Sequence, residues 1–392
     1  MRILVCSSEQ PIPPLNGLRL QLTAVLRELA PRHEITVVGS RWPDQQGERL
    51  QCVEAIDLPP PEVSRARRAR GWLASTARGL PASTTVITPP LAQAASELLA
   101  RRAYDVAYVT GPSMASVVPA LGDVPAVLGA LDAWHLNVAA EARVAPSVMR
   151  PLYRLEALHV RRFGARFYPA YRAVVAVTAE DADAIRAIAP GVETAVVPNG
   201  VDTALFSPGG AAEPGHVVLT GAMGYPPNMA AAEFLAEEVM PEVRARRPDA
   251  RLSLVGRAPS RRVLALDRHP GVDVVGEVPD IVPWLRRADV YACPMLSGTG
   301  IKNKLLEALA CGAPVVATPL ACQGMDVLDG DHVLMAEGAD AFAHAIVRVL
   351  DDRALRDALS QSGRRYVAEE QGWAAAARRL EHVLRDAAGD DR

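Results

Sequence analysis

Short apolar runs that alternate with helical patterns along the whole chain constrain its fold most strongly. Runs such as Ile3–Val5 consist of Val, Ile and Leu, and Gly- or Pro-containing segments separate the runs. Strands of this composition are typical of a parallel sheet buried on both faces. Their alternation with helices predicts an α/β fold with doubly wound sheets. The other runs are Ile35–Val38, Val106–Val109, Ala126–Leu128, Val174–Val177, Val196–Val197, Val217–Thr220, Leu252–Val255, Val272–Val275, Val290–Cys293 and Val315–Ala317.

The strand series is interrupted by two turn-rich clusters, Pro198–Asp202 and Pro208–Gly210. Such clusters are typical of a linker, and a length of 392 residues suits two to three domains. We therefore expect two α/β domains of similar size, residues 1–200 and 201–370. Ligands of open parallel sheets bind beyond the carboxyl ends of the strands, so the expected site is a cleft between the domains.

Composition excludes several classes of protein. The net charge of −3 and the aromatic content of 5% speak against a nucleic-acid partner. Five scattered cysteines without a C-x-x-C pair indicate a reducing compartment and no structural zinc. The first residues predict a strand and not a secretory leader, and no apolar run is long enough for a membrane helix. We expect a cytoplasmic protein.

Lysine is almost absent from this chain. Of 42 basic residues only Lys302 and Lys304 are lysine, and all others are arginine. If arginine replaces lysine at every position where either side chain functions, the remaining lysines would mark positions where arginine cannot replace them. Chance clustering is the alternative interpretation.

Both lysines lie in a glycine-rich segment between a strand and a helix. Gly298 and Gly300 let the backbone approach a ligand, and the helix that we expect from Ile301 to Gly312 presents free N–H groups that favour a phosphate. An ammonium is a compact point charge suited to a diphosphate. Glu307 lies among apolar helix residues, where its carboxylate could bind a diol such as ribose. A partly exposed carboxylate bound to backbone is the alternative.

The second half contains, in this order, the motifs Pro198–Asp202, Thr220–Asn228, Leu254–Arg257, Gly276–Asp280 and Glu307–Val316. Their order and spacing resemble those of GT-B glycosyltransferases of family 4, the large retaining group. The resemblance implies two Rossmann-like domains facing across a cleft, with the acceptor on residues 1–200 and the nucleotide-sugar donor mainly on residues 201–370. It also implies that a last helix, at about 371–388, packs back on the first domain.

The resemblance assigns roles to individual residues. His135 would contact the donor sugar near the reacting carbon, with Asp132 a weaker candidate, and Lys302, Lys304 and Glu307 complete the expected catalytic set. Arg19 either adds charge at the diphosphate or faces solvent. The expected donor-binding set is Gly17, Arg19, Gly221, Arg257, Val278, Thr299, Gly300 and Ile301, with Gly221 and Arg257 beside the diphosphate and Val278 beside the base.

The sequence departs from the family pattern at two places. Thr299 stands where many members carry the first of two glutamates, and Met223–Asn228 lacks the usual Arg–Lys pair. We infer that Lys302 and Lys304 compensate for that pair. The sequence resembles a subgroup with both changes.

No metal and no cofactor are expected. GT-B enzymes generally act without a metal, although Asp181 and Asp183 match the metal-binding Asp-x-Asp pattern by letter. Thr178, three residues before Asp181, indicates instead that both aspartates lie in the first turn of a capped helix.

The sequence thus predicts a metal-independent, retaining glycosyltransferase. It would move a hexose from a nucleoside-diphosphate sugar, UDP first and GDP second, to a hydroxyl of a glycan, lipid-linked or small-molecule acceptor, with the loops of Arg41–Ala82 shaping the acceptor site. A catalytically silent sugar-nucleotide-binding subunit is one alternative. An NAD-dependent oxidoreductase is the other, but the third glycine of G-x-G-x-x-G is missing after Gly300.

Two basic stretches, Arg65–Arg70 and Arg150–Arg166, are either solvated helix faces or contacts with an anionic surface. Peripheral contact with the inner membrane face through Arg65–Arg70 is therefore an expectation. The hexose, acceptor, linkage and oligomeric state stay open.

Overall fold

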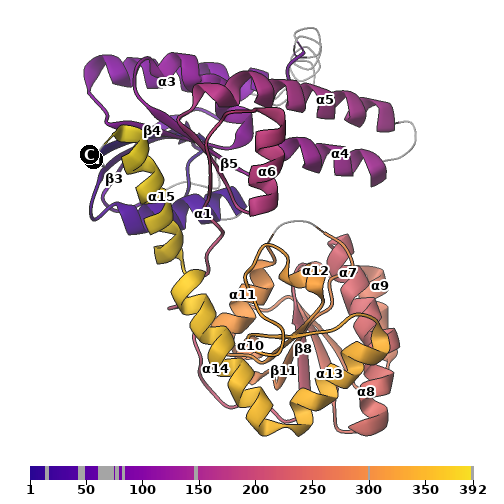
Figure 1. Cartoon of the computed structure of the whole chain (residues 1–392). Coiled ribbons are helices and arrows are strands. Elements are labelled where there is room, and N and C mark those ends of the chain that lie inside the picture. The colour runs from indigo at the N-terminus through magenta and orange to yellow at the C-terminus, as the bar shows by residue number, and fades with distance from the viewer. Residues whose placement is uncertain are drawn as a thin grey trace. The chain divides into compact units, whose positions relative to one another are not determined.

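The computed structural model describes residues 1–13, 17–42, 49–60, 75, 79–81, 84–144, 149–298 and 301–389. The chain divides into two compact units, coloured from indigo to yellow along the sequence in Figure 1. Unit 1 contains Met1–Pro198 and Ala376–Arg392, and unit 2 contains Asn199–Ala375.

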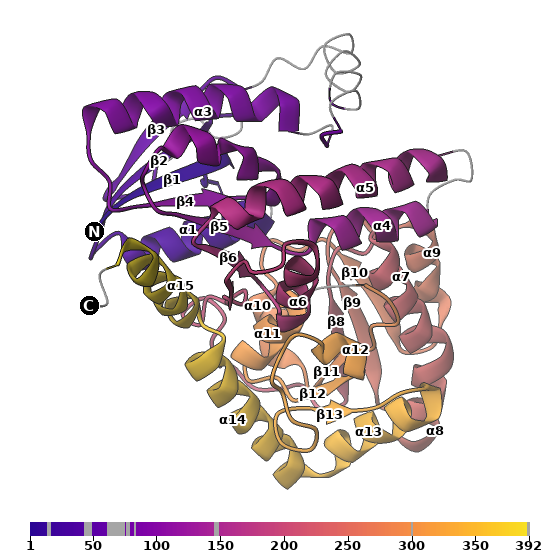
Figure 2. The same ribbon diagram turned by 45° about the horizontal axis from the view of Figure 1, so that its top comes forward.

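Unit 1 is built on a parallel seven-stranded sheet in the order β3-β2-β1-β4-β5-β6-β7. This confirms the doubly wound α/β fold. Right-handed crossovers in the two directions from β1 place α1 and α3 on opposite faces of the sheet (Figure 2). The strands are β1 (Arg2–Glu9), β2 (Glu34–Ser40), β3 (Val53–Leu58), β4 (Val106–Thr110), β5 (Ala126–Leu131), β6 (Ala173–Ala176) and β7 (Thr194–Val196).

The helices of unit 1 bury apolar side chains against this sheet. Leu4, Val109 and Leu128 from the strands and Phe163 from α5 belong to one buried core. The helices are α1 (Gly17–Leu29), α3 (Thr84–Arg101), α4 (Trp134–Val144), α5 (Arg150–Phe167) and α6 (Ala179–Ile188), with 3₁₀ segments η2 (Pro112–Leu121) and η3 (Tyr168–Ala170).

Helix α15 (Trp373–Ala388) begins in unit 2, and its residues from Ala376 on belong to unit 1. Leu380 and Leu384 are buried. The Glu381 carboxylate accepts hydrogen bonds from Arg32 at 2.6 Å and from His33 at 2.9 Å. Although burial opposes its charge, the hydrogen bonds from Arg32, Arg385 and His33 hold the pKa of Glu381 down at about 2. A charged cluster thus fixes the end of the chain to the start of unit 1.

Unit 2 repeats the design with a parallel six-stranded sheet in the order β10-β9-β8-β11-β12-β13. Its strands are β8 (His216–Thr220), β9 (Arg251–Val255), β10 (Val272–Gly276), β11 (Val290–Cys293), β12 (Val315–Ala317) and β13 (Leu334–Met335). Its helices are α7 (Pro226–Glu233), the π-helical η4 (Phe234–Val239), α8 (Met240–Arg246), α9 (Arg261–Leu264), the 3₁₀ segment η5 (Ala265–Arg268), α10 (Val282–Arg287), α11 (Asn303–Ala310), α12 (Pro319–Cys322), α13 (Ala339–Asp351) and α14 (Arg353–Glu370).

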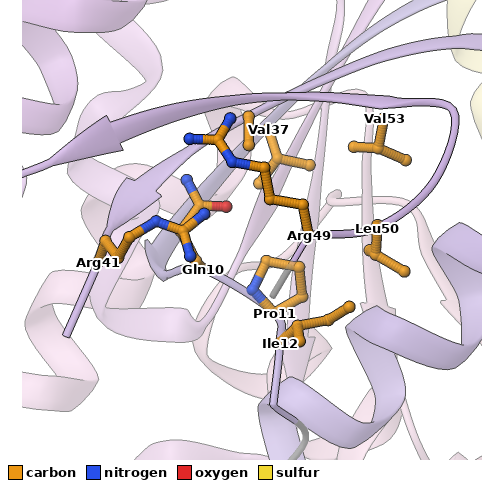
Figure 3. A pocket seen from close by; sticks show the side chains of 9 residues that line it. Gln10, Pro11, Ile12, Val37, Arg41, Arg49, Leu50 and Val53 are labelled. Atoms are coloured by element: carbon orange, nitrogen blue, oxygen red, sulfur yellow. The ribbon is translucent and has the colours of Figure 1, made fainter. Parts of the chain in front are cut away.

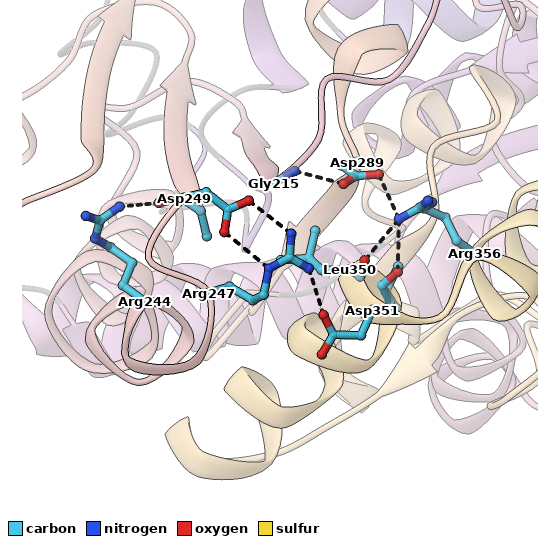
Figure 4. Close-up of polar contacts among 10 residues, drawn as sticks. Gly215, Arg244, Arg247, Asp249, Asp289, Leu350, Asp351 and Arg356 are labelled. Carbon is cyan, nitrogen blue, oxygen red and sulfur yellow. Dashed lines mark hydrogen bonds and ion pairs between the residues drawn. The ribbon is translucent and has the colours of Figure 1, made fainter.

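The amino edge of the unit 2 sheet carries a network of paired charges (Figure 4). The buried Asp289, just before β11, accepts the N–H of Gly215 at 2.9 Å and pairs with Arg356 at 3.2 Å. Arg247 lies between Asp249 and Asp351, at 3.0 and 2.7 Å. Because each of these cations has a carboxylate partner, we assign the network a structural role.

Candidate anion-binding site

The candidate site lies where the strand order of unit 2 reverses, between β8 and β11. Open α/β sheets bind ligands beyond the carboxyl ends of their strands at such a point. Gly221 follows β8, Gly256 follows β9, and Met295 follows β11 by two residues. All three therefore lie at the carboxyl edge of the sheet, opposite the paired charges of Figure 4.

Backbone segments approach one another closely at this edge. A Cβ atom on Gly256 would lie 1.7 Å from the carbonyl oxygen of Gly221, so no side chain fits there. A Cβ on Gly221 would lie 2.8 Å from the Asn228 amide nitrogen and 3.4 Å from Lys304 Nζ. The backbone just after β8 and β9 therefore carries no side chain at Gly221 and Gly256, and Gly221 lies close to Lys304.

Helix α11 carries both lysines at its beginning. Lys302 is the N-cap residue, and the helix starts at Asn303, two residues later than the sequence indicates. At the other end Gly312 has φ +75°, and the N–H groups of Gly312 and Ala313 bond to Leu309 and Ala308 in a Schellman motif. Thr299 and Gly300 lie outside the described residues, and Gly298, with φ +109°, comes just before them.

The two ammonium groups lie in different surroundings. Lys302 is buried, and its Nζ is 3.4 Å from the carbonyl oxygen of Gly298. Lys304 Nζ donates to the amide oxygen of Asn228 and lies 3.5 Å from the sulfur of Met295. Burial lowers the pKa of both lysines, and their mutual repulsion lowers that of Lys302 further. Among the described residues no carboxylate lies within ion-pair distance of Lys304, so this half-buried charge is suited to an added anion.

Glu307 lies one turn further along α11. Burial raises the pKa of its carboxyl to about 7, while the charge of Lys304 opposes this shift. No hydrogen bond to this carboxylate is formed within the described part of the chain, which speaks against the backbone-bound alternative. The carboxylate can therefore accept hydrogen bonds from an added donor such as a sugar hydroxyl.

Three further residues that the sequence predicts for the donor site lie at the same edge, and their side chains differ in exposure. The Arg257 side chain is exposed after β9, and its carbonyl accepts the N–H of Met223 at 2.9 Å. Val278, after β10, and Ile301, before α11, pack partly buried against the core. Of the expected second-domain residues, the structure brings Gly221 within reach of Lys304.

Asn228 is a residue of the candidate site that sequence reasoning missed. It lies in the first turns of α7, is buried, and bridges Lys304 to the carbonyl oxygen of Ala222, to which its amide nitrogen donates at 3.0 Å. The signal was present: Asn228 belongs to the segment in which the usual Arg–Lys pair is missing. That segment supplies a polar support for Lys304 instead of a cation.

In unit 1, Arg19 is engaged within the fold. Gly17 opens α1, and the buried Arg19 donates from Nε to Glu9 at 2.8 Å. The expectation that Arg19 faces solvent is wrong, because the guanidinium is held against a carboxylate at the end of β1.

His135 and Asp132 lie at the junction of β5 and α4. Burial and the nearby charge of Arg161 lower the pKa of His135, so the imidazole is neutral at pH 7. Burial and Asp181 raise the pKa of Asp132, which accepts a hydrogen bond from Asn137 at 2.8 Å. A neutral imidazole can donate or accept a hydrogen bond at a sugar hydroxyl.

The Asp-x-Asp pattern forms a helix cap. Thr178 accepts the N–H of Asp181 at 3.0 Å and donates to its carboxylate at 2.7 Å. The same carboxylate accepts the N–H of Ala133 at 3.0 Å, whereas Asp183 pairs with Arg186 on the surface of α6. The two aspartates thus have separate partners. In the described ranges no cluster of three or more His, Cys, Asp or Glu residues is arranged to hold a metal ion.

A pocket in unit 1 lies at the carboxyl ends of β1 and β2 (Figure 3). Arg41 and Arg49 both pair with Asp57, at 2.8 and 3.0 Å, and Ile12 and Leu50 provide apolar lining. Of the expected acceptor loops, residues 43–48, 61–74, 76–78 and 82 fall outside the described chain, and Arg65–Arg70 with them.

Two family models match the chain in succession. "Glycosyltransferase Family 4" matches residues 15–205, and "Glycosyl transferases group 1" matches residues 214–352.

Curated relatives match in part. A "GDP-mannose-dependent monoacylated alpha-(1-6)-phosphatidylinositol monomannoside mannosyltransferase" of Corynebacterium glutamicum is 33% identical over 38% of this chain and 42% of its own. A "Phosphatidyl-myo-inositol mannosyltransferase" of Mycolicibacterium smegmatis is 33% identical over 42% of this chain and 45% of its own. The chain thus spans less than half the length of these two relatives.

Solved structures share the fold. The sucrose-phosphate synthase of Thermosynechococcus elongatus has a TM-score of 0.72 at 17% identity, covering 100% of this chain and 99% of that one. HepE of Anabaena in complex with UDP-glucose has a TM-score of 0.65 at 17% identity, covering 98% and 100%. At this identity the likeness concerns the fold alone.

Proposed function

Because the chain belongs to glycosyltransferase family 4 and has its two-unit GT-B fold, we propose that it transfers a hexose from a nucleoside-diphosphate sugar to a hydroxyl acceptor. The observation that carries this proposal is the pair of ammonium groups at the start of α11, Lys302 buried and Lys304 half-buried, beside the backbone of Gly221. An anion with two or more charges, such as a diphosphate, is the ligand class that suits them.

The proposed chemistry places the largest demand on the leaving group. As the bond between the sugar carbon and the phosphate oxygen breaks, negative charge grows on the diphosphate. Preorganised cations at that position stabilise the transition state, and Lys302 and Lys304 would supply them without a metal. A front-face route, which the family implies, forms the acceptor oxygen–carbon bond on the same side and moves the acceptor proton to the leaving phosphate oxygen. The roles of His135 beside the sugar and of Gly17 and Arg257 beside the diphosphate stay predictions.

The nucleotide and the acceptor are narrower proposals. Relatives at 33% identity include one named for GDP-mannose, which moves GDP ahead of UDP in our proposal. The relatives are also named for phosphatidylinositol acceptors, which favours a lipid-linked hydroxyl acceptor over a soluble small molecule. The ribose diol of either nucleotide suits the Glu307 carboxylate.

Calorimetry with GDP and UDP tests the donor site directly. Lys302→Ala or Lys304→Ala is expected to weaken nucleoside-diphosphate binding by about 1.5–3 kcal/mol each, the range for hydrogen bonds between charged groups. Arg261→Ala removes an exposed cation on α9 of the same unit and serves as the matched control, which should bind like the wild type. Unchanged affinity in both lysine variants would remove the basis of the proposal.

Turnover distinguishes an enzyme from a silent binding subunit. We expect slow hydrolysis of a bound GDP- or UDP-hexose, with the anomeric configuration of the sugar retained on transfer. Turnover is also expected to persist after EDTA treatment. Strict recovery by a divalent cation would show that the lysines do not suffice.

A further inference from the structure

Helix α5 exposes a row of apolar side chains on the outside of unit 1. Leu152, Leu155 and Leu158 follow one another at intervals of three residues, and 36–40% of each is exposed. Residues three apart on a helix are neighbours on its surface, so these side chains form one continuous strip. In a helix that only packs against its own core, leucines would lie on the buried side.

The buried side of α5 is already occupied. Val160 and Phe163 are buried, and Phe163 packs in the core of unit 1 against Trp134 and Phe167. Gly164 packs so closely that a Cβ there would lie 2.8 Å from Ile188. The leucine strip therefore forms a second apolar face on a helix whose first face is used.

Arginines surround the strip. Leu158 has Arg154 one turn before it and Arg161 and Arg162 one turn after it, and all three are exposed. No carboxylate within the described residues lies at ion-pair distance from these three guanidinium groups; Arg161 instead helps to lower the pKa of His135. A long arginine side chain can lay its methylenes along an apolar layer and place its charge at anionic headgroups.

We propose that this surface, the exposed face of α5 with Leu152, Leu155, Leu158, Arg154 and Arg162, binds the protein to an anionic lipid bilayer. A helix with leucines flanked by arginines on one face lies in the interface plane of a membrane, with the apolar strip among the acyl chains. Within the described chain no helix is long and apolar enough to cross a membrane, so the contact is peripheral. An acidic protein partner explains the arginines but not the leucine strip between them.

The test uses the full chain and vesicles, without donor or acceptor, so it is independent of the proposed activity. Vesicles of phosphatidylglycerol and phosphatidylcholine, against phosphatidylcholine alone, are sedimented with the protein. We expect binding to the anionic vesicles that weakens as salt is raised. Arg154→Gln/Arg162→Gln should reduce binding about thirtyfold, at about fivefold per arginine. Leu155→Ser/Leu158→Ser should reduce it at least tenfold, on the scale of two lost apolar side chains.

Matched controls lie in unit 2. Arg261→Gln/Arg268→Gln removes two exposed charges, and Leu264→Ser removes a leucine that is 50% exposed; both should bind like the wild type. Circular dichroism melts verify that each variant folds.

Four results would overturn the proposal. The first is equal binding to neutral and anionic vesicles, and the second is vesicle binding that the leucine double variant leaves intact. The third is a change of oligomeric state in sedimentation velocity, with unchanged vesicle binding, which would assign the surface to a second copy of the chain. Loss of binding on replacing only Arg65–Arg70 would likewise place the membrane contact elsewhere.

Discussion

Charged side chains at the two edges of the unit 2 sheet have different kinds of partner. At the amino edge, Asp289 is paired with Arg356 and with the N–H of Gly215. At the carboxyl edge, Lys304 contacts an amide oxygen and a thioether sulfur. Both edges belong to the same layer and share the same core, so the difference does not come from burial alone.

The comparison separates charges that stabilise the fold from charges kept for a ligand. In a buried ion pair each charge already has its partner, so removing one partner leaves an uncompensated charge and costs stability. An ammonium held by neutral atoms keeps its charge available to a ligand. Its partial burial without a counter-ion costs stability and lowers the pKa of the lysine. The expected consequence is that variants at the two edges affect different measurements.

The largest expected effect is on stability at the amino edge. Arg356→Met leaves Asp289 buried without its cation and should lower the free energy of unfolding by about 3 kcal/mol in urea titrations. Affinity for a nucleoside diphosphate should stay within twofold. Asp351→Asn, in an exposed pair with Arg247, is the control and should cost about 0.5 kcal/mol. A tenfold loss of nucleotide affinity in folded Arg356→Met would contradict the assignment of the amino edge to stability alone.

The next effect is on affinity at the carboxyl edge. Asn228→Asp places a carboxylate on Lys304 and so reproduces the closed pairing of the amino edge. We expect nucleoside-diphosphate binding to weaken by about 2 kcal/mol in calorimetry, because the ammonium is neutralised and the new charge repels the ligand. Asn228→Ala removes the amide without adding charge and should lose clearly less. Equal losses in the two variants would indicate that Asn228 acts through packing alone.

The smallest effect is a pH dependence. Because burial raises the pKa of Glu307 to about 7, the folded protein holds this proton more tightly than the unfolded chain does. The resulting stabilisation is fully present below about pH 4.5 and is lost as the pH rises through 7. Glu307→Gln should therefore flatten the fall in stability between pH 4.5 and 7 by about 1 kcal/mol, a value reduced for solvent screening because the carboxyl is only half-buried. Parallel curves for wild type and variant would show that the carboxyl does not titrate there.

The fold follows from the sequence where strands are continuous apolar runs. All the runs that we identified fall on strands of the two sheets, with β6 and β7 each ending one residue early. Strand β3 was missed because Glu54 and Asp57 interrupt it, as is typical of an edge strand with one solvated side. The two-residue β13 is too short to leave a pattern.

The site could be predicted in outline but not in its contacts. The lysine pair, Gly221 and Glu307 were identifiable by residue type and by position after a strand. The support of Lys304 by Asn228 was not, because it joins residues 76 positions apart through a side-chain hydrogen bond. The burial of Arg19 was missed for the same reason: its partner Glu9 lies on another element, and local sequence does not show which of two surfaces a helix presents.

The position of α15 in chain order has a consequence for synthesis on the ribosome. In unit 1, Leu380 and Leu384 of α15 are buried and Glu381 pairs with Arg32 and His33, yet all of unit 2 is translated in between. At about 5–20 residues per second, the nascent first unit waits roughly 10–35 s with that face uncovered. Unit 1 is therefore the first unit to leave the ribosome and the last to be completed. During this interval a chaperone could bind the uncovered face, and a premature stop would leave unit 1 without α15.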